Sequence, residues 1–149
     1  MASAIMIYSN AKGFSEAAKM IYLSPHYGDR HHMLILPIGH LVGFGIELYL
    51  KSFLTHHGVD KRRLSSRALG HNLIALYDLA LTFGFSLAHR KLLDEFHHHH
   101  SAFEFRYADD DTVFHIPSHV ETFTAMDALD RYVDGVVGAS ASHGLQPGH

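Results

Sequence analysis

Apolar residues recur at intervals of three and four along most of the chain, which is the spacing of α-helices with one buried face. The pattern predicts helices over 13–23, from about 32 to 57, from about 72 to 83, after Ser86 as far as about 107, and over 118–138. No stretch shows the sustained alternation of apolar and polar residues that is typical of β-strands. We therefore expect an all-α fold, an up-and-down bundle of four to five helices.

Capping residues and proline refine the ends of these helices. Pro37 lacks a backbone N–H, so we expect a kink or a helix start close to it. Asn72 is a good N-cap for the helix that follows it. Ser118, with Glu121 three residues later, predicts a capping box. The basic segment 61–67 is expected to be a connector.

The length and composition favour one domain. The chain has 149 residues, of which 47% are hydrophobic, and this is enough to bury a core without a metal or a disulfide. Beyond Gly138 the sequence is rich in small and polar residues. We expect 1–138 to form a single helical bundle and 139–149 to be a flexible C-terminal tail.

The predicted central helix contains two charged residues in apolar surroundings. The run 39–54, GHLVGFGIELYLKSFL, is apolar nearly all round, and Glu47 and Lys51 lie four residues apart, on the same face. An unpaired ionised group inside an apolar core costs several kcal/mol. We therefore expect these charges to have partners, with Glu47 paired to Lys51 or, across the bundle, to Arg106.

Three segments together resemble a known family. They are ELYLKSFL at 47–54, GHNLIALYDLA at 70–80 and FRYAD at 105–109, and in this order they resemble the HEPN domain family of small helical domains. The resemblance covers nearly the whole chain. It implies a HEPN-like up-and-down bundle, frequent homodimerisation, and roles in RNA cleavage, nucleotide binding, toxin–antitoxin pairing or defence. It also implies that a nucleotidyltransferase-type protein can be a partner.

Several polar residues match positions that recur in the family. The matching residues are Glu47, Lys51, His71, Asn72, Arg106 and Tyr107. In one interpretation they form a structural network that pairs charges and caps a helix. In the other they line a cleft for a nucleotide or another phosphate ligand, with Lys51 and Arg106 as anion contacts. The sequence leaves both interpretations open.

The resemblance also raises the hypothesis of a metal-independent endoribonuclease. Active members of the family carry an R-x4-6-H motif, whose histidine can transfer a proton and whose arginine can stabilise charge on the phosphate. Arg106 departs from this pattern, because His115 follows it only after eight residues. Arg90 and His97 have the six-residue spacing, although a chain with 16 histidines offers chance matches. The candidate catalytic residues are therefore Arg90, His97 and Arg106.

The histidine run at 97–100 suggests a third hypothesis, a histidine-based metal-binding protein. Consecutive helical residues point in different directions, so these four side chains cannot all bind one ion. His97 with His100, or His100 with Glu104, could share one. The candidate metal ligands are therefore His97, His100 and Glu104, with His100 in the core as the structural alternative.

Composition excludes several other classes. The absence of cysteine excludes disulfides and thiolate metal sites. No phosphate-loop, dinucleotide-binding, hydrolase or zinc-protease motif occurs, so no cofactor is expected. The net charge of −3 does not favour nucleic-acid binding. We also see no signal peptide and no continuous apolar span, which indicates a cytoplasmic protein without a membrane helix.

The leading hypothesis is a non-catalytic or catalytically degenerate HEPN-like domain, acting as a homodimer. Its expected ligand is a nucleotide, an RNA or a partner protein.

Overall fold

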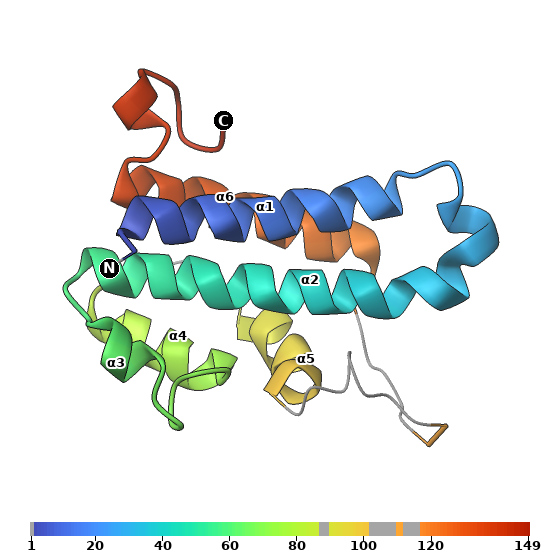
Figure 1. The fold of residues 1–149 in the computed structure, drawn as a ribbon, viewed down its shortest axis with the longest axis horizontal. Coiled ribbons are helices and arrows are strands. Elements are labelled where there is room, and N and C mark those ends of the chain that lie inside the picture. Colours follow the sequence, from blue (N-terminus) through green and yellow to red (C-terminus); the bar gives the residue numbers. More distant parts are fainter. Residues whose placement is uncertain (1, 87–89, 102–109, 112–116) are drawn as a thin grey trace.

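The computed structural model describes residues 2–86, 90–101, 110–111 and 117–149. Over these ranges the helices are α1 (Ala4–Tyr22), α2 (Tyr27–His56), α3 (Lys61–Leu64), α4 (Leu73–Thr82), α5 (Arg90–Ser101) and α6 (His119–Val137), followed by a short 3-10 turn, η1 (Ala141–His143). Figure 1 shows α1 and α2 as long antiparallel neighbours, with α6 beside α1 and with α3, α4 and α5 on the other side of α2. No strand occurs in the described ranges, and the predicted all-α bundle is confirmed.

The central helix of the fold is α2, which contacts α1, α4, α5 and α6. Its large side chains fill the core: Val42, Ile46, Tyr49, Leu50, Phe53 and Leu54 are all at most 2% exposed. Burying one such side chain is worth roughly 1.5–3 kcal/mol. Gly45 lets α6 approach, because a Cβ there would lie 2.9 Å from Cε of Met126. The core therefore holds α2 rigidly and fixes the charged residues that it carries.

The expected kink at Pro37 was wrong. Helix α2 begins at Tyr27, has its only non-helical backbone angles at Arg30 (φ −124°, ψ 17°), and continues through Pro37. Proline removes one hydrogen bond, the one to the carbonyl of Met33. Met33 is 63% exposed, so water can replace the missing donor. The helix tolerates the proline for this reason.

Two other helix boundaries also differ from the expectation. Helix α1 begins at Ala4, well before Gly13, and Ser3 caps it by accepting a hydrogen bond from the N–H of Met6 at 3.2 Å. The basic connector contains the short helix α3, which Asp60 caps. A cap was overlooked in both cases, because neither Ser3 nor Asp60 was considered as an N-cap.

The predicted caps of the later helices are confirmed. The side chain of Asn72 accepts a hydrogen bond from the N–H of Ala75 at 3.0 Å, at the start of α4. Ser118 and Glu121 form the capping box of α6. The capping residues thus located the starts of both helices from sequence alone.

A buried carboxylate in α6 joins three helices. The hydroxyls of Tyr8 in α1 and Tyr49 in α2 each donate to Oδ1 of Asp130 at 2.8 Å. Lys12 adds a longer contact of 3.4 Å to Oδ2. Burial and the neighbouring carboxylate raise the pKa of both tyrosines above the ordinary value, so they remain hydrogen-bond donors. The sequence analysis did not identify this network.

Several polar contacts and two buried residues connect the segment after α6 to the bundle, although most of residues 141–149 are exposed. Ala139 and Ser140 are buried, and Ser140 bonds to Asp134 through both its N–H and its hydroxyl. The N–H of Gly148 donates to Oδ2 of Asp134 at 2.7 Å, and Lys12 donates to the carbonyl of His149 at 2.8 Å. Polar contacts hold this segment, so apolar content was a poor guide to its packing.

These contacts predict an acid-sensitive attachment. Burial alone would raise the pKa of Asp134, but the hydrogen bonds from Ser140 and Gly148 outweigh it and hold that pKa below its ordinary value. The contribution of Asp134 to stability is therefore complete above the unfolded-state pKa of about 3.9 and is lost as the pH falls through the lower folded-state value. Urea unfolding between pH 6 and pH 3 should show a smaller loss of stability for Asp134→Asn than for wild type. Equal slopes would contradict this role.

One described helix is long and apolar enough to cross a membrane, and it is α2. The sequence analysis looked for a continuous apolar span, whereas this test asks for a long helix of high mean hydropathy, which the core helix of a soluble protein also satisfies. Half of its apolar window is buried inside the protein, where α1, α4, α5 and α6 contact α2. This coverage is typical of the core helix of a soluble bundle.

Candidate functional site

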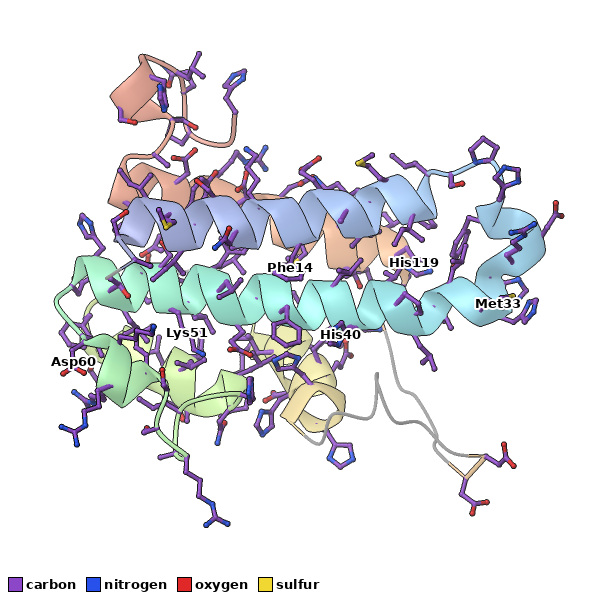
Figure 2. All side chains as sticks on the ribbon, viewed as in Figure 1. Phe14, Met33, His40, Lys51, Asp60 and His119 are labelled. Atoms are coloured by element: carbon purple, nitrogen blue, oxygen red, sulfur yellow. The ribbon has the colours of Figure 1, made fainter. Side chains whose placement is uncertain are left out.

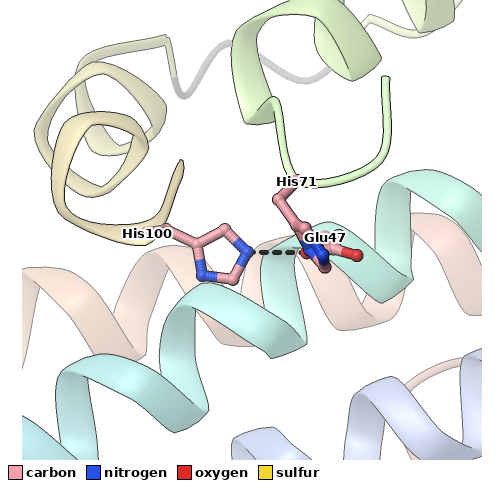
Figure 3. A group of neighbouring side chains, drawn as sticks. All are labelled: Glu47, His71 and His100. Carbon is pink, nitrogen blue, oxygen red and sulfur yellow. Dashed lines mark hydrogen bonds and ion pairs between the residues drawn. The ribbon is translucent and has the colours of Figure 1, made fainter. Parts of the chain in front are cut away.

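The carboxylate of Glu47, in the middle of α2, accepts hydrogen bonds from three side chains, of which Figure 3 shows His71 and His100. Its Oε2 atom lies 2.6 Å from Nε2 of His100 and 3.0 Å from Nδ1 of His71. Its Oε1 atom lies 2.6 Å from Nζ of Lys51, one turn further along α2. We call these four residues the Glu47 cluster. It joins α2 to α5 and to the loop that precedes α4.

The hydrogen bonds define which ring nitrogens carry protons. An ionised carboxylate can only accept hydrogen bonds, so Nε2 of His100 and Nδ1 of His71 must be the donors. Burial alone would raise the pKa of Glu47, but the bonds from His100, Lys51 and His71 outweigh it and lower the pKa to about 2. Glu47 is therefore ionised at neutral pH although its side chain is only 3% exposed.

The position of His100 depends on a glycine in α2. A Cβ at Gly43 would lie 2.6 Å from Nδ1 of His100, so only glycine leaves room for the ring. The ring of Phe44 meets the same imidazole edge-on, with centroids 5.0 Å apart. Gly43 and Glu47 lie one turn apart on α2, so together they make a slot that ends in a carboxylate.

His71 approaches the cluster from the loop before α4. Asn72 caps α4 directly after it, and Lys51 donates to the carbonyl of Gly70 at 2.7 Å directly before it. These two bonds fix the backbone on both sides of His71. The His71 side chain is 45% exposed, whereas that of His100 is 2% exposed. The cluster therefore reaches solvent at His71.

A groove lies beside the cluster, between the start of α1, the later part of α2 and α3. Its volume is about 200 Å³, and Lys51 lines it together with Lys61, Thr55 and Ser65. The rest of its lining is apolar, including Leu48. Figure 2 shows Lys51 and Asp60, the cap of α3, at the same end of the molecule. The groove thus combines an apolar floor with two ammonium groups and two hydroxyls.

The segment that supplies Lys61 to this groove is basic. Lys61, Arg62, Arg63 and Arg67 are exposed, and within the described ranges none of them forms an ion pair. Lys12, Lys19, Lys51 and Arg90 are all paired with acidic groups. Arg30 and Arg131 likewise form no ion pair in the described ranges, so only part of the unpaired positive charge lies in and just after α3, where Lys61 lines the groove.

The structure brings together only part of the predicted ligand-binding set. Glu47, Lys51 and His71 belong to one cluster, and the predicted pairing of Glu47 with Lys51 is present. Asn72 caps α4, as the structural interpretation requires. Arg106 and Tyr107 lie outside the described residues.

The predicted catalytic pair does not converge within one chain. Arg90 and His97 are two turns apart on α5, a rise of about 10 Å. Arg90 bonds to Asp78 at 2.9 Å and to Asp94 at 3.1 Å, so its charge is already paired. Burial lowers the pKa of His97, and its buried Nδ1 has no hydrogen-bond partner among the residues that the structure describes. A site composed of two protomers stays a prediction.

The predicted metal ligands are also regrouped. His100 lies in a group of potential ligands with Glu47 and His71, which does not include His97. Glu104 lies outside the described residues. The sequence analysis missed this group because it paired Glu47 with cations only. Two features of the sequence could have indicated this group. His100 lies at core spacing, and a buried histidine needs a hydrogen-bond partner. Gly43, one turn before Glu47, leaves room for a neighbouring side chain.

Comparison of the chain with protein-family models, with curated proteins and with solved structures found no match. The features of the molecule that bear on function are therefore the Glu47 cluster, the groove and the basic segment 61–67.

Proposed function

We propose that the chain is a HEPN-like, non-catalytic domain that binds a mononucleotide in the groove beside α3. The observation that carries this proposal is a partly apolar groove lined by Lys61, in a segment that holds four exposed cations with no ion pair in the described ranges. A nucleotide has both features that such a groove can recognise, an apolar ring and a phosphate group. Cytoplasmic location and homodimerisation belong to the same proposal.

Each part of the groove has a role in this proposal. Lys61 supplies positive charge for the phosphate, and the hydroxyls of Thr55 and Ser65 can donate hydrogen bonds to it. Lys51 uses two of its three N–H groups for Glu47 and Gly70, which leaves one N–H for a ligand. The volume of about 200 Å³ lies below the roughly 300–1,000 Å³ of typical ligand pockets, so the ligand is only partly enclosed.

The paired state of Arg90 favours binding over cleavage. An arginine that stabilises a phosphate transition state must offer its charge to the substrate. Here Asp78 and Asp94 neutralise it. The ribonuclease hypothesis therefore lacks an available arginine at this position. A site that uses Arg106 and a second protomer remains the alternative.

Titration calorimetry with ATP and with adenosine, in EDTA, tests the proposal. Wild type should bind ATP and should bind adenosine much more weakly, because the cations contact phosphate. Lys61→Ala should weaken ATP binding about tenfold. This effect is in the lower part of the free-energy range for a hydrogen bond to a charged group, because Lys61 is exposed to solvent.

Lys91→Ala is the matched control, since Lys91 is an 84% exposed lysine on α5, away from the groove. It should leave ATP affinity unchanged. Equal effects of the two substitutions, or no ATP binding by folded wild type, would overturn the proposal. Cleavage of mixed RNA in EDTA that is lost in Arg106→Ala would support the ribonuclease instead.

A further inference from the structure

The Glu47 cluster has more donors than a structural ion pair needs. Lys51 already neutralises Glu47 through Oε1, yet two imidazoles converge on the other oxygen, Oε2. One potential ligand atom from each of Glu47, His71 and His100 lies within 4.8 Å of the other two. These residues come from three separate segments, so local sequence does not force them together.

We propose that Glu47, His71 and His100 bind one divalent transition-metal ion, and that zinc is the ion that fits best. The three proposed ligands do not line the nucleotide groove, which uses Lys61 and the hydroxyls of Thr55 and Ser65, although Lys51 contacts both Glu47 and the groove. Neither proposal depends on the other.

The distances between the potential ligand atoms are close to those of a zinc site. Zinc lies about 2.0–2.1 Å from its nitrogen and oxygen ligands, so the ligand atoms of a tetrahedral site are about 3.3 Å apart. The distances of 2.6 Å from Oε2 to His100 and 3.0 Å from Oε2 to His71 are shorter than this by about 0.7 Å and 0.3 Å. Small rotations of the exposed His71 ring and of the carboxylate would open the required space.

The ligand set favours a divalent transition metal over magnesium or calcium. Two imidazoles and one carboxylate are typical of zinc sites that keep an open fourth position. Magnesium and calcium prefer oxygen ligands, so they should not compete. The chain has no cysteine, and its metal chemistry is restricted to nitrogen and oxygen ligands.

Metal binding requires each imidazole to change its tautomer. A neutral ring keeps its proton, which moves from one ring nitrogen to the other. The nitrogens that now donate to Glu47 must present a lone pair to the ion. The proton of His100 then moves to Nδ1 and that of His71 moves to Nε2. Lys51 stays on Oε1, where it orients the carboxylate and leaves Oε2 to the metal.

The site is preorganised on one side and open on the other. His100 and Glu47 are buried, and Gly43 and Phe44 hold the His100 ring in place. His71 is 45% exposed and gives an ion a route from solvent. The fourth ligand would enter on this side, as a water molecule or another small donor.

Zinc titration of the full chain against a competing chromophoric chelator, after treatment with EDTA, tests the proposal. Wild type should bind one zinc ion tightly, and excess magnesium should not displace it. His71→Ala should lower that affinity by at least about 100-fold, since even residues that only orient a metal ligand cost 10–100-fold. His71 is half exposed, so its substitution is expected to preserve the fold, which circular dichroism would verify.

His98→Ala is the matched control, because His98 is an exposed histidine close to His100 on α5. It should leave the tight site unchanged. Zinc should also raise the thermal unfolding temperature of wild type and of His98→Ala, but not that of His71→Ala. Unchanged tight binding in His71→Ala, loss of it in His98→Ala, or only weak binding by wild type would overturn the proposal.

Discussion

Replacing Glu47 with alanine should lower the free energy of unfolding by about 3–5 kcal/mol, the range for breaking a buried ion pair. The substitution leaves Lys51, whose side chain is 16% exposed, without its counter-charge. It also removes the acceptor of His100 and His71. Urea unfolding in EDTA at pH 7, with wild type as the reference, measures this loss without any contribution from metal.

Glu16→Ala is the matched control for this measurement. Glu16 forms the same kind of pair with Lys19 on α1, but its side chain is 52% exposed. An exposed pair contributes about 0–1 kcal/mol, so this variant should be nearly as stable as wild type. Similar losses for the two variants would show that the Glu47 cluster is not a buried network.

Glu47→Gln should be milder than Glu47→Ala. Glutamine keeps one oxygen for Lys51, and its amide can donate to an imidazole that has changed tautomer. The charge is still lost, so stability should remain below that of wild type. If Glu47→Ala is too unstable to study, this variant gives the same test with a smaller effect.

The second large effect is expected at Gly43. Gly43→Ala should destabilise the protein by about 1–3 kcal/mol through overpacking, because its Cβ would lie 2.6 Å from Nδ1 of the buried His100 ring. The ring would have to move away from Glu47. The change can be followed by urea unfolding together with the affinity for zinc, which should also fall.

The control for Gly43→Ala is Gly13→Ala. Both glycines are helical, but a Cβ at Gly13 would have no atom within 4 Å. Alanine at Gly13 should therefore raise stability by about 0.5–1 kcal/mol, the difference in helix propensity. If the change in stability has opposite signs at Gly43 and Gly13, the difference can be assigned to the contact with His100. A stabilising Gly43→Ala would contradict the proposed slot.

The fold class could be predicted from the sequence because helical periodicity and capping residues are local signals. Asn72 and the pair Ser118 and Glu121 marked the starts of α4 and α6 correctly. Pro37 misled, since the cost of proline depends on whether the carbonyl that it leaves unpaired can reach water. The packing of residues 139–149 was missed because polar contacts to Asp134 hold this segment.

The candidate site was less predictable because it depends on contacts between distant segments. The pairing of Glu47 with Lys51 follows from their spacing on one helix. The meeting of Glu47 with His100 joins residues 53 positions apart, and the sequence offered several other histidines for that place. The basic segment around Lys61 was interpreted as a connector, because its position beside a groove appears only in three dimensions.

The central claim is that Glu47 gathers His71 and His100 on one carboxylate oxygen. Long-range nitrogen–proton NMR spectra of the imidazole rings, recorded in EDTA at neutral pH and assigned with His71→Ala and a conservative His100→Gln variant, test it most directly. We expect the proton on Nε2 for His100 and on Nδ1 for His71, and both signals should shift in Glu47→Gln. Freely averaging tautomers for both rings, unchanged in Glu47→Gln, would contradict the claim.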